Sequence, residues 1–175
     1  MKKAVSQIAF RYIFEFIVAG FAGWIYEVAT VWVMYHYFDN RGILHLPIVP
    51  IYAVGAFILL GLLGERKRNP LFVFVFSAVI TTAFEIGSSY LLEFIFHKRF
   101  WTYRTWKLSI CDDRSDLIAS AIFGILAVGY FFWLHPLSDK LSSKLPKPLC
   151  VILSVIAAGA VLTDLAISVY GLLGS

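Results

Sequence analysis

Long apolar blocks, separated by short polar stretches, make up most of the chain. Such blocks are typical of membrane-crossing helices, because a helix needs about 20 apolar residues to cross a bilayer. We predict five helical spans, over residues 8–37, 51–63, 71–96, 117–134 and 149–173. The second block is short, so residues 44–50 before it are a candidate re-entrant segment of irregular backbone. The pattern therefore predicts an all-α, polytopic, multi-pass protein of the cell membrane.

We expect one transmembrane domain over residues 1–175, with a four-span core at 1–137 and an additional C-terminal span at 149–175. Residues 138–148 are rich in lysine and proline, which is typical of a linker. Glu27 precedes Arg41 by fourteen residues, and Glu85 precedes Arg99 by the same spacing. Either two helical hairpins in parallel repeat or chance explains the match.

Composition supports the membrane assignment and narrows the function. The chain is 60% hydrophobic and only 15% charged, whereas soluble domains are nearer 45–50% apolar and about 25% charged. The net charge of +4 comes from basic residues between the apolar blocks, which argues against nucleic-acid binding. Basic residues are more numerous on the side of the membrane that holds the N-terminus, which predicts that this side is cytoplasmic. The basic residues on it are Lys2, Lys3, Arg66, Lys67, Arg68, Lys140, Lys144 and Lys147.

A polar ladder runs through the third span. Its residues recur every four positions, which places them on one face of a helix: Thr81, Glu85, Ser89, Glu93 and His97. A carboxylate at the centre of a bilayer costs roughly 3 kcal/mol or more. We therefore expect this face to look into a protein interior or a wet cavity.

The arginines after the odd-numbered spans are the best partners for the buried glutamates. Arg41, Arg99 and Arg114 lie on the side opposite the N-terminus in the predicted topology. In one interpretation, Glu27 and Glu85 each hold an arginine and lock the loops onto the bundle. In the other, the arginines line an outward-facing cavity and bind an anionic group, while the glutamates orient them or carry protons. Alternatively, Asp112, Asp113 and Asp116 could neutralise the basic side chains of the loop at 97–114.

Further candidates lie around these charges. Asn40, Trp101 and Tyr103 stand beside the arginines and extend the candidate binding site. Glu93 and His97, one helical turn apart, are candidate acid/base groups. Two such ligands do not make a metal site, even with His45 as a third, and an interfacial salt bridge is the simpler explanation. The sequence has no GxxxxGK[ST], GxSxG, HExxH or GxGxxG pattern, so no known catalytic motif and no cofactor is indicated, and any enzyme chemistry would have to come from the Glu, His and Arg residues above.

Several blocks of the sequence resemble the bacterial family called putative ABC-transporter type IV, or CmpB-like, which is related to the transmembrane protein 229 group. The blocks are Gly23-Trp24-Ile25-Tyr26-Glu27, Asn40-Arg41-Gly42, Pro47, Pro50-Ile51-Tyr52, Gly55, Glu85, Ser88-Ser89, Leu91-Leu92-Glu93, Arg99-Phe100-Trp101, Tyr103, Arg114, Ser120, Phe123-Gly124 and His135-Pro136-Leu137. The resemblance covers residues 14–137 and implies a transporter permease.

Three functions remain open at this point. The first is a transporter, or the membrane subunit of one with a separate ATPase, that binds a small anionic or lipid-like substrate. The second is a membrane-embedded enzyme that acts on a lipid or lipid-linked substrate through Glu93, His97 or Glu85. The third is a non-catalytic assembly protein whose charges are structural. Membrane lipid and further copies of the chain are expected partners, since five short spans enclose little volume.

Overall fold

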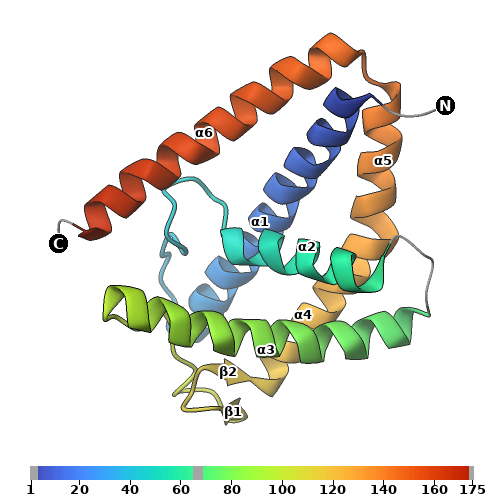
Figure 1. Ribbon diagram of the computed structural model, residues 1–175. Coiled ribbons are helices and arrows are strands. Elements are labelled where there is room, and N and C mark those ends of the chain that lie inside the picture. The colour runs from blue at the N-terminus through green and yellow to red at the C-terminus, as the bar shows by residue number, and fades with distance from the viewer. Residues whose placement is uncertain (1–3, 65–68, 174–175) are drawn as a thin grey trace. The chain divides into compact units, whose positions relative to one another are not determined.

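The computed structural model describes residues 4–64 and 69–173, and these residues are mostly helical (Figure 1). The helices are α1 (Val5–Tyr35), α2 (Pro50–Leu63), α3 (Pro70–Phe96), α4 (Leu117–Gly129), α5 (His135–Lys144) and α6 (Lys147–Leu173). A π-helical turn, Tyr130–Leu134, joins α4 to α5. Two short antiparallel strands, β1 (Ser109–Ile110) and β2 (Ser115–Asp116), form a hairpin before α4. The topology argument from Lys2, Lys3, Arg66, Lys67 and Arg68 lies outside the described residues.

Four described helical segments are long and apolar enough to cross a membrane: Val5–Tyr35, Pro70–Phe96, Leu117–Lys144 and Lys147–Gly171. The prediction of a helical membrane protein is therefore confirmed. The second predicted span is present as α2, which is apolar but has only 14 residues. At 1.5 Å per residue it is about 21 Å long, short of the roughly 30 Å of a hydrocarbon core.

The candidate re-entrant segment has irregular backbone that the protein covers. Leu44, Ile48 and Val49 are buried although they belong to no helix. The Val49 backbone N–H donates to the Gly20 carbonyl oxygen of α1, at 3.0 Å. Irregular backbone is tolerated at membrane depth only under such cover.

The fourth span does not end before Pro136, where the sequence predicts its end. The helix continues from Leu117 through the π-helical turn to Lys144. Pro136 follows directly after the π-helical turn, where the regular i→i−4 hydrogen bonds are already interrupted, so the helix accommodates a residue without a backbone N–H. Most of the predicted linker at 138–148 is therefore helical, and the chain leaves helical geometry only around Leu145, between α5 and α6.

The chain divides into two compact units. Unit 1 comprises residues 1–56 and 134–175, and within it α1 packs against both α5 and α6. Unit 2 comprises residues 57–133, and within it α3 packs along α4 while β2 contacts both helices. Figure 1 shows α3 in green and the hairpin in yellow. Each unit carries one part of the predicted site.

Candidate functional site

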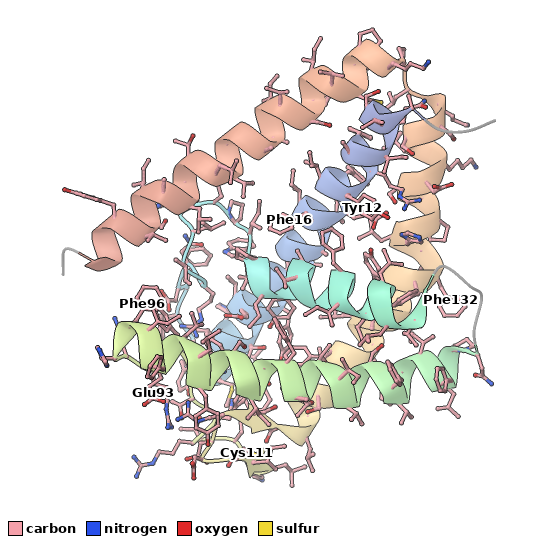
Figure 2. The ribbon with its side chains drawn as sticks, in the orientation of Figure 1. Tyr12, Phe16, Glu93, Phe96, Cys111 and Phe132 are labelled. Carbon is pink, nitrogen blue, oxygen red and sulfur yellow. The ribbon has the colours of Figure 1, made fainter. Side chains whose placement is uncertain are left out.

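The C-terminal half of α3 carries the charged cluster of unit 2. Asn69 begins the helix by accepting the Leu71 N–H, and Pro70 occupies its first turn. The ladder residues Glu85 and Ser89 are buried, as its spacing predicts. His97 stands just beyond the helix with a left-handed backbone (φ 51°), so it departs from the ladder face. Figure 2 shows Glu93 near the end of α3 and Cys111 in the hairpin loop.

Arg114 enters this cluster from the hairpin. Its Nη1 donates to Ser89 Oγ at 2.9 Å and its Nη2 to Glu93 Oε2 at 2.5 Å. Its guanidinium carbon lies 3.6 Å from the centroid of the Tyr90 ring, a cation–π distance. Desolvation by itself would lower the pKa of Arg114, but the hydrogen bonds and charges of Glu93 and Tyr90 outweigh it and raise that pKa. Arg114 is therefore a permanently charged, almost fully buried anchor of the loop.

Arg99 shares the same carboxylate. Its Nε lies 3.8 Å from Glu93 Oε2, and its Nη1 donates to the Asp112 backbone oxygen at 3.0 Å. About a third of the Arg99 side chain stays exposed. Two guanidinium groups therefore converge on one carboxylate at this end of α3.

The loop aspartates mainly bind neutral donors. Asp112 accepts the Tyr90 hydroxyl at 3.3 Å, and Asp113 accepts the Ser109 hydroxyl at 2.7 Å. Asp116 caps α4 by accepting the Ile118 backbone N–H, and its other oxygen accepts the Leu108 backbone N–H of the loop. Their carboxylates therefore fold the loop through these bonds.

Glu85 has a different partner from the one that the spacing suggests. Its Oε1 accepts the Tyr103 hydroxyl at 2.7 Å, while Arg99, fourteen residues after Glu85, lies at Glu93. The Trp101 indole N–H donates to the Arg114 backbone oxygen at 3.2 Å. Trp101 and Tyr103 thus hold the loop that carries both arginines.

In unit 1, the predicted pair of Glu27 and Arg41 is present. Arg41 Nε lies 3.5 Å from Glu27 Oε2, and Arg41 Nη1 donates to Asp39 at 3.2 Å. Tyr52 of α2 also hydrogen-bonds to Glu27. Two carboxylates thus share one guanidinium here, whereas two guanidinium groups share one carboxylate at Glu93.

Asn40 organises the irregular segment after α1. Its side-chain oxygen accepts the Trp24 indole N–H at 2.7 Å, and its amide donates to the His45 backbone oxygen at 3.2 Å. Gly42 follows with φ +96°, a backbone angle that favours glycine. These contacts give Asn40 a role in local folding.

Asp164 clamps the same segment from α6. It accepts the Leu46 backbone N–H at 2.9 Å and contacts His45 Nδ1 at 2.8 Å, and Ser168 Oγ lies 3.1 Å from the same nitrogen. His45 is thus engaged in unit 1, although the sequence offered it as a third metal ligand beside Glu93 and His97. In the described part of the chain, no group of three or more His, Cys, Asp or Glu residues is placed to hold a metal ion.

A buried polar cluster between α1 and α5 escaped the sequence analysis. Glu15 is fully buried and accepts His135 Nδ1–H at 3.0 Å and the Ser138 hydroxyl through Oε1. Arg11 Nε lies 3.8 Å from Glu15, and Arg11 Nη1 donates to Asp139 at 2.8 Å. The four-residue spacing of Arg11 and Glu15 was the available signal, but nothing local pointed to partners about 120 residues away.

The sequence comparisons agree with the motifs. The family model described as "Putative ABC-transporter type IV" matches residues 14–169. The match extends past residue 137, where the visible motifs end, and includes most of α6. No curated protein and no solved structure is significantly similar to the chain. Because the match covers most of its length, the chain belongs to this ABC-transporter type IV family.

Proposed function

We propose that the protein is a transporter, or the membrane subunit of one, and that Arg99 and Arg114 bind an anionic group of its substrate. The substrate is a small anion or a lipid-like molecule with an anionic headgroup. The site opens into an outward-facing polar cavity, and the N-terminus lies in the cytoplasm. Family membership and the four long apolar helices support the transporter part of this proposal.

One observation carries the choice of an anionic ligand. Glu93 is shared by Arg99 and Arg114, so two permanent positive charges converge on one carboxylate. Guanidinium groups suit carboxylate and phosphate because their planar N–H groups match these oxyanions. Arg99 is partly exposed, so it can meet a ligand, while the buried Arg114 supplies charge from behind.

The geometry favours this cluster over the one in unit 1. Arg41 already contacts two carboxylates, Glu27 and Asp39, so an anion would compete with both of them there. We assign Glu27, Arg41 and Asn40 to the folding of residues 36–49. An enzyme that uses Glu93 as its acid or base is also less favoured, since a proton on Glu93 would break two ion pairs.

Native mass spectrometry of the protein in nanodiscs tests the proposal. The wild type should retain an anionic lipid or small molecule, and Arg99→Ala should reduce its occupancy by about tenfold, as expected for a lost charged hydrogen bond. Arg104→Ala is the matched control, because Arg104 is an exposed arginine of the same loop. Equal retention in Arg99→Ala and the wild type would refute the assignment.

A further inference from the structure

A stripe of polar residues on α3 runs from the arginine pair deep into the span. Its members follow one another at four-residue steps: Ser77, Thr81, Glu85, Ser89 and Glu93. At 1.5 Å per residue the stripe is about 24 Å long, against roughly 30 Å for a hydrocarbon core. It therefore reaches across most of the depth of a bilayer.

Three of the five stripe residues are buried, whereas Thr81 and Glu93 are partly exposed. Ser77, Glu85 and Ser89 are buried, at 0%, 7% and 3% exposure. Val75 and Val79, on another side of the same helix, are more than half exposed. Most buried residues of α3 are thus polar, and an ionisable residue such as Glu85 on the buried face of a membrane helix is a candidate for an ion or substrate pathway.

Two hydroxyl groups of unit 2 have unmet hydrogen-bonding capacity. Ser77 Oγ and Ser115 Oγ are fully buried and have no hydrogen-bond partner among the described residues. A buried hydroxyl without a partner is costly, so such groups indicate water or another polar species in the protein. Ser77 lies on the stripe itself, and Ser115 lies in β2, which contacts α3, directly after Arg114.

Helix packing uses the neighbouring row of α3. The Thr82 hydroxyl donates to Ser120 Oγ of α4 at 2.6 Å. Gly124 of α4 meets Phe74, since a Cβ at Gly124 would lie 2.8–2.9 Å from the Phe74 ring and backbone oxygen. Positions 74 and 82 precede Ser77 and Glu85 by three residues, so these packing contacts border the stripe on the same side of the helix. These packing contacts use Thr82 and Phe74, while the hydroxyl of Ser77, in the bordering row, has no hydrogen-bond partner among the described residues.

The two glutamates of the stripe differ in what they can do. Glu93 contacts two guanidinium groups, which favour its ionised form. Glu85 contacts the Tyr103 hydroxyl, which can donate to a carboxylate or accept from a carboxylic acid. The Tyr103 contact can thus persist in both protonation states of Glu85.

We propose that this stripe lines a hydrated path for protons through unit 2, with Glu85 as the group that takes up and releases the proton. The evidence that the path is hydrated comes from the polar stripe and from the buried hydroxyl groups of Ser77 and Ser115. Its use to drive anion transport rests on the proposed function. The path would give the transporter a proton-coupled energy source.

Cysteine labelling in nanodiscs tests whether the path is hydrated. In a background without the native Cys111 and Cys150, Ser77→Cys and Thr81→Cys should react with a water-soluble, cationic methanethiosulfonate reagent. Val79→Cys is the control, because it lies at the same depth, between these positions, on an exposed apolar side. Nanodiscs expose both membrane surfaces to the reagent, so the result does not depend on the orientation of the chain.

We expect Ser77→Cys and Thr81→Cys to react at least about tenfold faster than Val79→Cys, since the thiol must meet water to ionise. Equal rates at all three positions would overturn the proposal, and two stripe positions guard against a variant that does not fold. Loss of anion retention in Arg99→Ala is a separate measurement, so the path and the proposed function can fail independently.

Dicyclohexylcarbodiimide tests the role of Glu85, because this reagent modifies protonated carboxyl groups in apolar surroundings. Peptide mapping should find the adduct on Glu85 and not on Glu93, and Glu85→Gln should remove it. An unmodified Glu85 at mildly acidic pH would refute its role as the proton carrier.

Discussion

Gly23 offers the sharpest test of the packing in unit 1. A Cβ at Gly23 would lie 2.3 Å from both Cδ2 and Cγ of Tyr52 and 2.8 Å from its Cβ. Carbon atoms in contact lie about 3.5 Å apart, so the added methyl group would be roughly 1.2 Å too close. The Tyr52 ring cannot swing clear, because the clash includes the Cβ that fixes it to α2.

The expected loss of stability in Gly23→Ala follows from two opposing terms. Overpacking costs about 1–3 kcal/mol, and the two close ring atoms place this site in the upper half of that range. Replacing glycine by alanine in a helix returns about 1 kcal/mol. The net loss of about 1–2 kcal/mol corresponds to a fall in Tm of roughly 2–8 °C for a chain of this size.

Thermal unfolding in one detergent, followed by tryptophan fluorescence, measures this change. Gly55→Ala is the matched control, because Gly55 lies in the same helix as Tyr52 and nothing comes within 4 Å of its added Cβ. That variant should gain about 1 kcal/mol, or roughly 2–4 °C. If Gly23→Ala is as stable as Gly55→Ala, α1 and α2 do not meet through Gly23 and Tyr52 as described.

Two further predictions concern buried polar groups of unit 1. Glu15→Gln should lower stability by about 3–5 kcal/mol, because it removes a fully buried charge from its partners, whereas Asp139→Asn, at the more exposed end of the cluster, should cost clearly less; equal melting temperatures for the two variants would contradict the cluster. Asp164→Ala should speed hydrogen exchange of residues 44–49 more than His45→Ala does, because Asp164 also accepts the Leu46 backbone N–H. The reverse order would show that α6 holds this segment through the histidine.

Much of the fold could be predicted from local pattern. The apolar blocks correspond to α1, α2, α3, α4 and α6, and the family motifs agree with the family match. The continuation of the helix past Pro136 could not be predicted, because proline usually ends a helix unless an irregularity such as a π-helical turn accommodates it. Which of these cases applies depends on the packing of α5 against α1.

The candidate site shows the same division. The Glu27–Arg41 pair could be predicted, since both residues lie in one short helix-to-loop connection. The same fourteen-residue spacing suggested Arg99 as the partner of Glu85. In the structure, the Tyr103 hydroxyl donates to Glu85 instead. Tyr90, whose ring packs on Arg114, was missed because it lies one residue off the ladder.

The sequence by itself determined that this is a helical membrane protein with a polar face on its third apolar block. Transfer of a segment into lipid depends on the summed hydrophobicity of its own residues, so it can be read without knowing the neighbours. Only the tertiary structure decided which charges meet. Partners such as Glu15 and His135, or His45 and Asp164, are more than a hundred residues apart, and their contact depends on where the packed helices place each side chain.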